Sequence, residues 1–313
     1  MKNVELYGPR APKHRRTWTA AAIPLIIVFF VLGQLATIFA VLKPMGFHQA
    51  DLATQWLPLV IQLAGFGFTA LLLLAWVWLF ERRTPRVLGF NGAFVRRYMR
   101  GLLVGCGFLL AVIALIWIAG GYRIEGRGVW TAPSPILFLP ILALLGGFMI
   151  QGGTEELLMR GWLMHLVASR HGLVAAVVIN SVLFAVMHGG NIAPSKDLAL
   201  ALVNLILFGV MISLYAIKEG SLWGVCAWHT AWNWLLGVGF GLEVSGGRLA
   251  VQSLVIDLAP KAGAPWWLTG GAFGPEASVA TTIVLLAASI CFGVTGAFRT
   301  ARARSASFGT SAS

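Results

Sequence analysis

The feature that most constrains this chain is a series of long apolar runs separated by short polar stretches. The runs cover about 19–42, 55–80, 101–119, 135–155, 172–190, 199–217, 220–241 and 278–298. A helix needs about 20 residues to cross a hydrocarbon core of about 30 Å. The apolarity is continuous rather than alternating, which favours helices over the strands of a barrel. The sequence therefore predicts an all-α polytopic transmembrane bundle of about eight spans.

Composition supports the same class of protein. The chain is 58% hydrophobic and 11% charged, whereas soluble domains carry about 25% charged residues. This balance excludes an ordinary soluble enzyme. The net charge of +12 comes from basic residues in the short stretches between apolar runs, so we expect the lipid bilayer as a partner and no nucleic acid.

The distribution of basic residues predicts an orientation. With the N-terminus in the cytoplasm, the inner segments hold 16 Lys and Arg, against six in the outer segments. Basic residues accumulate on the cytoplasmic side of membrane proteins. We therefore expect a multi-pass protein of the cell membrane with both termini cytoplasmic: a basic N-terminus over 1–18, one transmembrane domain over 19–298, and a disordered tail over 299–313.

The fourth run ends in GGTEELLMRGW, which places ionisable side chains at or near membrane depth. Such groups are costly there, so they indicate a functional site. Glu156 and Arg160 are four residues apart on a helix and can form an ion pair. Glu155 is rotated by about 100° from that pair. It is therefore the carboxylate left for acid–base chemistry.

Two further runs carry residue pairs at helical spacing. Phe184 and His188 are four residues apart, and so are His229 and Asn233, so each pair shares one helix face. Midway between Glu155 and His188 lies the turn-like stretch 169–172. An antiparallel hairpin folded there sets both side chains at the same depth.

One conflict remains in this stretch. A straight helix over 135–170 would be about 54 Å long, which exceeds the hydrocarbon core. The helix is therefore either broken at 146–147 or 152–153, or its end projects into the cytoplasm.

A carboxylate, two imidazoles and a carboxamide provide a base for water and donors for a developing oxyanion. Hydrolysis of a peptide bond needs this set. The chain has no HExxH zinc motif, no GxSxG elbow, and no Asp within the spans, which excludes other peptidase designs.

The three motifs EExxxR, FxxxH and HxxxN, in this order within a motif core over 150–235, resemble the CPBP family. This family, also called Abi or CAAX-protease-like, includes the type II CAAX prenyl endopeptidases. The resemblance implies a protease-like transmembrane domain that cuts a membrane-associated peptide or protein substrate with a lipidated or hydrophobic segment.

The resemblance also implies roles for the residues. Glu155 would activate the hydrolytic water with His188, while His229 and Asn233 would stabilise the oxyanion. Supporting positions fall to Glu156, Arg160 and Phe184.

The sequence leaves two questions open. Glu155, His188 and His229 are candidate ligands for Zn²⁺, but Glu155 and His188 can also act without a metal; we lean slightly toward no obligatory tight metal. An immunity or scaffold protein of the same fold without catalysis is an alternative function, and a proton-coupled transporter is a weaker one.

Overall fold

The computed structural model describes residues 4–9, 11, 13–131 and 133–293, together with 296, 302, 303 and 307. The predicted tail over 299–313, and the last residues of the run 278–298, fall mostly outside this described part.

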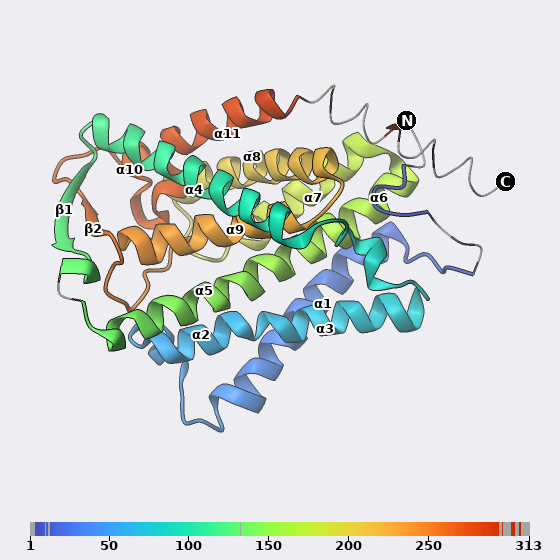
Figure 1. Ribbon diagram of the computed structural model, residues 1–313, viewed down its shortest axis with the longest axis horizontal. Helices are drawn as coiled ribbons and strands as arrows, with labels where there is room; N and C mark the ends of the chain where they lie inside the picture. The colour runs from blue at the N-terminus through green and yellow to red at the C-terminus, as the bar shows by residue number, and fades with distance from the viewer. Residues whose placement is uncertain are drawn as a thin grey trace.

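The described chain is a bundle of helices that run roughly along one axis (Figure 1). This confirms the predicted all-α polytopic fold. The main helices are α1 (Thr19–Thr37), α2 (Trp56–Ala64), α3 (Phe66–Ala75), α4 (Phe94–Ile118), α5 (Pro135–Glu156), α6 (Met164–His171), α7 (Leu173–Met187), α8 (Lys196–Glu219), α9 (Trp223–Trp234) and α11 (Val279–Phe292). Short π-helical segments extend several of them: η1 (Ile38–Leu42), η3 (Trp76–Phe80), η6 (Leu157–Leu163) and η7 (Leu235–Gly239).

Each predicted run contains helix. Five helices in the described residues are long and apolar enough to cross a membrane, and two apolar helices, α7 and α11, are shorter. The five are Thr19–Leu42, Trp56–Phe80, Phe94–Ile118, Pro135–His171 and Lys196–Glu219. The remaining run, 220–241, forms α9 and η7.

The two ends of the bundle differ. We call the end where α6 finishes and α9 begins the termini end, because the N-terminal segment and the end of α11 lie there (Figure 1). The opposite end carries a two-stranded antiparallel sheet of β1 (Tyr122–Arg127) and β2 (Ile256–Pro260); we call it the strand end. These strands were not predicted, because they lie in connections between the apolar runs and have no long alternating pattern. The short helix α10 (Trp266–Thr269) follows them.

The long helix that carries the two glutamates is continuous. Pro135–His171 forms 37 helical residues, about 55 Å at 1.5 Å per residue. Of the two alternatives left open by the sequence, the helix is not broken, since residues 146–147 and 152–153 lie within regular helix. The excess length is accommodated by the extension of η6 and α6 toward the termini end.

The hairpin after this helix turns where the sequence indicated. Gly172 has φ +87°, a backbone conformation that favours glycine, and α7 begins at the next residue. Helix α7 is nine residues shorter than α8, or about 14 Å. It packs against α8 where Gly209 contacts Ser181. It therefore ends part of the way along α8, and His188 stands at this end.

Helices α4 and α9 approach each other through small residues, as membrane helices commonly do. A Cβ at Gly101 would overlap the backbone carbonyl oxygen of Gly224. One at Gly105 would lie 2.6 Å from the carbonyl oxygen of Trp228. Glycine in α4 therefore sets the position of α9, which carries two site residues.

We predict that Gly101→Ala lowers the free energy of unfolding by about 1–3 kcal/mol, because the new methyl group meets backbone that cannot move aside. Gly107→Ala is the matched control on the same helix, since a Cβ there has no neighbour within 4 Å. The control should be neutral or slightly stabilising. Unfolding in detergent micelles measures both, and equal losses would contradict this account of the α4 and α9 contact.

Candidate active site

The two adjacent glutamates at the end of α5 have different surroundings. The Glu156 side chain is fully buried, whereas the Glu155 side chain is 15% exposed. Glu155 lines a cavity, and Glu156 does not. The helical rotation between neighbours, expected from the sequence, thus separates one carboxylate that reaches open space from one that is enclosed.

Glu156 is held in a buried cluster of charged and aromatic groups. Arg160 NH1 lies 3.1 Å from Glu156 Oε1, and His229 Nδ1 lies 2.9 Å from the same oxygen. The Arg160 guanidinium also covers the rings of Phe184 and Phe208, at 4.8 and 5.4 Å from their centroids. A buried carboxylate needs this kind of compensation to remain charged. The cluster joins α5 and η6 to α7, α8 and α9.

Glu155 is oriented by two amide side chains. Gln151 Nε2 donates to Glu155 Oε1 at 2.6 Å, and Asn233 Nδ2 donates to Gln151 Oε1 at 3.1 Å. The other oxygen, Glu155 Oε2, lies 3.7 Å from His229 Nε2. Gln151 was not predicted as a site residue, although its position four residues before Glu155 on the same helix face was a usable signal.

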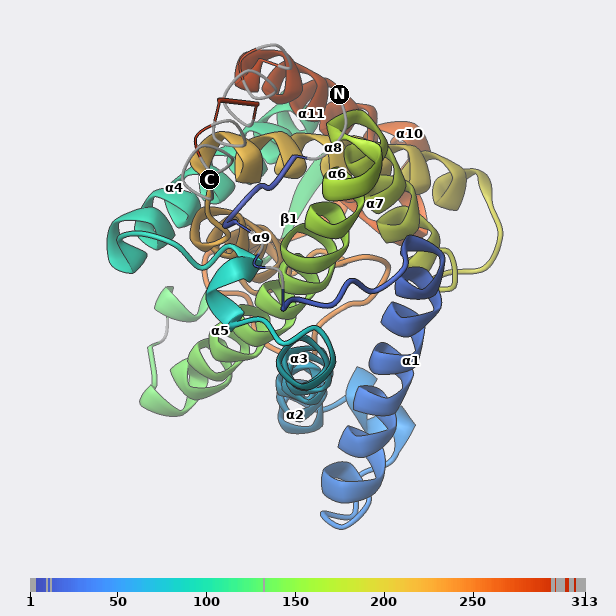
Figure 2. The same cartoon turned by 90° about the vertical axis from the view of Figure 1, so that its right-hand side faces the viewer.

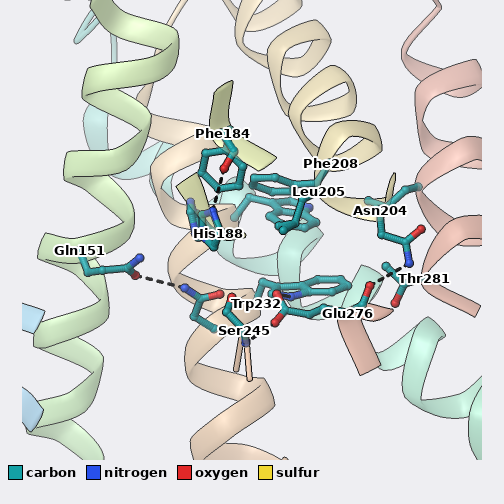
Figure 3. A pocket seen from close by; sticks show the side chains of 14 residues that line it. Gln151, Phe184, His188, Asn204, Leu205, Phe208, Trp232, Ser245, Glu276 and Thr281 are labelled. Atoms are coloured by element: carbon teal, nitrogen blue, oxygen red, sulfur yellow. Dashed lines mark hydrogen bonds between the residues drawn. The ribbon is translucent and has the colours of Figure 1, made fainter. Parts of the chain in front are cut away.

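His188 projects from the end of α7 into a second pocket, which shares several lining residues with the cavity that Glu155 lines (Figure 3). Its Nδ1 lies 2.8 Å from the backbone oxygen of Phe184. Because a carbonyl oxygen only accepts hydrogen bonds, Nδ1 carries the proton. In the neutral ring, Nε2 then keeps its lone pair.

Glu155 and His188 line one cavity of about 590 Å³, together with Gln151 and Asn233. The described side chains show no direct hydrogen bond between Glu155 and His188. The histidine that stands next to Glu155 is His229. The helices that carry the predicted residues do meet at this cavity. The sequence did not indicate that His229 contacts both glutamates.

A third carboxylate, not predicted as a site residue, borders the adjoining pocket. Glu276 lies with His188 and Trp232 around this pocket (Figure 3). Its Oε1 accepts from Trp232 Nε1 at 3.1 Å, and its Oε2 accepts from the backbone N–H of Ser245. Burial raises the pKa of the Glu276 carboxyl. The glycine-rich run before it, 268–275, lies between two of the predicted apolar runs. Its local sequence pattern does not show that the chain turns inward there.

The proposed metal ligands do not form a preformed site. Among the described residues, no group of three or more His, Cys, Asp or Glu side chains is close enough to hold a metal ion. Glu155 Oε2 and His229 Nε2 lie 3.7 Å apart, but no hydrogen bond or ion pair among the described residues joins His188 to either of them. The arrangement as it stands does not fit Zn²⁺ on Glu155, His188 and His229.

The fold and these side chains define a class of protein, a polytopic membrane protein with a polar site enclosed by helices. Residues 135–235, about a third of the chain, match the family model of type II CAAX prenyl endopeptidase Rce1-like proteins. This segment holds all three motifs, and over it the chain is similar to the CAAX protease (CPBP) family of intramembrane proteases. Searches of curated proteins and of solved structures found no match.

We predict that Arg160→Met lowers the free energy of unfolding by about 3–5 kcal/mol, because it leaves the buried Glu156 without its guanidinium partner. Adding Glu156→Gln to this variant should restore part of the loss. The four proteins of this double-mutant cycle are compared by unfolding in micelles. If the two single losses simply add in the double variant, the proposed coupling of Glu156 with Arg160 is wrong.

Proposed function

We propose that this protein is an endopeptidase that hydrolyses a peptide bond of a membrane-associated substrate, with Glu155 as the general base. One observation carries the proposal: of the two glutamates, only Glu155 reaches the cavity. Glu156 is enclosed and neutralised by Arg160 and His229. A general base must lie within hydrogen-bond distance of the water molecule that it deprotonates.

His188 is proposed to share the activation of water with Glu155. Its Nε2 bears the lone pair, and the side chain borders the same cavity as Glu155. A water molecule between the two side chains could donate one hydrogen to the carboxylate and one to the imidazole. The attacking oxygen would then be oriented by two acceptors on different helices.

His229 and Asn233 are proposed as donors to the oxyanion. Glu156 accepts the Nδ1 proton of His229, so Nε2 faces Glu155. His229 Nε2 lies 3.7 Å from Glu155 Oε2, so a proton on this nitrogen lies between the ring and the carboxylate. When it resides on Nε2, His229 can donate to an oxyanion. Asn233 uses one amide N–H for Gln151 and has a second to offer.

The proposed reaction balances within these residues. Water attacks the scissile carbonyl carbon and gives its proton to Glu155, while the negative charge on the carbonyl oxygen is met by His229 and Asn233. Glu155 then returns the proton to the leaving amine as the carbon–nitrogen bond breaks. No step is assigned to a metal, because the described residues form no group of three side chains that could hold one.

The cavity suits a hydrophobic or lipidated segment of the substrate. Apolar side chains form much of its wall, from several different helices: Phe30, Leu52, Leu59, Leu63, Phe66, Phe148, Leu158, Met159, Phe184 and Met187. The predicted outer segments hold six Lys and Arg and the predicted inner segments hold 16, which favours the orientation with both termini cytoplasmic in the cell membrane.

We predict that Glu155→Ala and His188→Ala each reduce cleavage by at least about 100-fold, the lower end of what a positioned general base contributes. Membrane proteomes of cells with wild-type or variant protein are compared for new peptide termini. Lys261→Ala is the control, because Lys261 is exposed, follows β2 and does not line the cavity.

Folded protein that still cleaves in both variants would contradict this mechanism. Wild-type biological function in Glu155→Ala cells without any new termini would instead favour the immunity or scaffold role. Proton-linked flux in proteoliposomes would favour a transporter.

A further inference from the structure

The two ends of the bundle give the site unequal access. Beyond Glu155, every residue from Glu156 to Ser169 is buried. Before Glu155, the same helix exposes side chains along its length, such as Ile136, Leu142 and Met149. Glu155 therefore lies at the boundary between a helix segment with exposed side chains and a segment in which every residue is buried.

The chain before α1 closes the termini end. Figure 2, which views this end, shows the N-terminal segment crossing the bundle before it enters α1. Val4, Leu6 and Tyr7 are all buried. The N-terminal stretch, expected from sequence only as a basic cytoplasmic segment, thus forms part of the core.

Specific bonds fix this segment to the helix that carries the glutamates. Tyr7 OH donates to the backbone oxygen of Arg160 at 3.2 Å, and the Leu6 N–H donates to His165 Nδ1 at 3.2 Å. The Val4 N–H donates to the oxygen of Ala168 at 3.2 Å. These three contacts follow η6 and α6 over two turns, so the segment seals the route from the termini end to the site.

The strand end is open by comparison. Since α7 stops at Met187, the backbone over 188–195 is not helical. Non-helical backbone at membrane depth is tolerated where it lines a polar cavity. The cavity that contains Glu155 continues along it to exposed residues that include Gln49, Ala53, Asn191 and Gly247.

The rim of the cavity is tied to the sheet. Arg248, which lines the cavity, has its NH2 atom 3.4 Å from Asp257 Oδ1 in β2 and 3.6 Å from Glu125 Oε2 in β1. The opening thus lies on the side of the strand end. This side carries the six basic residues of the outer segments, against 16 on the other side.

We propose that the site is reached from the extracytoplasmic side, so that its substrates are exported, membrane-anchored polypeptides with the scissile bond in the outer half of the membrane. The proposal rests on the proposed function for the nature of the substrate, and on the geometry of the cavity together with the distribution of basic residues for the direction of access. A cytosolic protein with a lipidated C-terminus would have to approach the sealed end.

Direction of access can be tested without any substrate. In a variant without Cys106, Cys226 and Cys291, a single cysteine replaces Met187 or, independently, Leu59. Both side chains line the cavity and are half-buried. A membrane-impermeant thiol reagent is then applied to right-side-out and to inside-out vesicles.

We expect labelling of Met187→Cys and Leu59→Cys to be at least tenfold faster in right-side-out vesicles. Lys13→Cys, an exposed position in the N-terminal segment, should react only in inside-out vesicles, and Lys261→Cys, exposed beyond β2, only in right-side-out ones. Faster labelling of the cavity cysteines from the cytoplasmic side, equal labelling from both sides, or none from either would overturn the proposal, as would reversed behaviour of the two exposed markers.

Cleavage is measured in a separate experiment from the thiol labelling. The new termini that depend on Glu155 should map to the extracytoplasmic flanks of membrane anchors, and termini in cytosolic C-terminal segments would contradict the proposed substrates. Cavity labelling from outside in a protein that yields no new termini at all would refute proteolysis while upholding the direction of access.

Discussion

The structure depends on one buried interaction, the contact of Glu156 with Arg160 and His229 within the bundle. These groups lie in fully or nearly fully buried positions, where an uncompensated charge would be very costly. Because Glu156 binds a cation on its own helix and an imidazole on α9, it fixes the rotation of both helices. That rotation directs Glu155 into the cavity.

The remaining geometry follows from this arrangement. Glycine contacts between α4 and α9 let α9 approach closely enough to bring His229 to Glu156. The short helix α7 leaves His188 at its end, bordering the cavity. Gln151 links Glu155 to Asn233, so two amide side chains hold the reactive carboxylate in place.

Much of this could be predicted from sequence, because the signals were local. The ion pair of Glu156 with Arg160 follows from helical spacing, and the turn at Gly172 follows from the position midway between Glu155 and His188. The features that were missed depend on segments distant in sequence: the insertion of Tyr7 against Arg160, and the inward turn that brings Glu276 to Trp232. Spacing along one helix carries no information on which loop returns to it.

The central claim is that the two glutamates divide the work, with Glu156 holding the bundle and Glu155 doing the chemistry. It is tested most directly by measuring unfolding free energy and cleavage rate together for Glu155→Gln and Glu156→Gln. The account predicts that Glu155→Gln stays as stable as wild type and is inactive, whereas Glu156→Gln is less stable by about 1–3 kcal/mol, the cost of weakening a buried charged hydrogen bond. Activity retained in Glu155→Gln, with stability lost there instead, would contradict it.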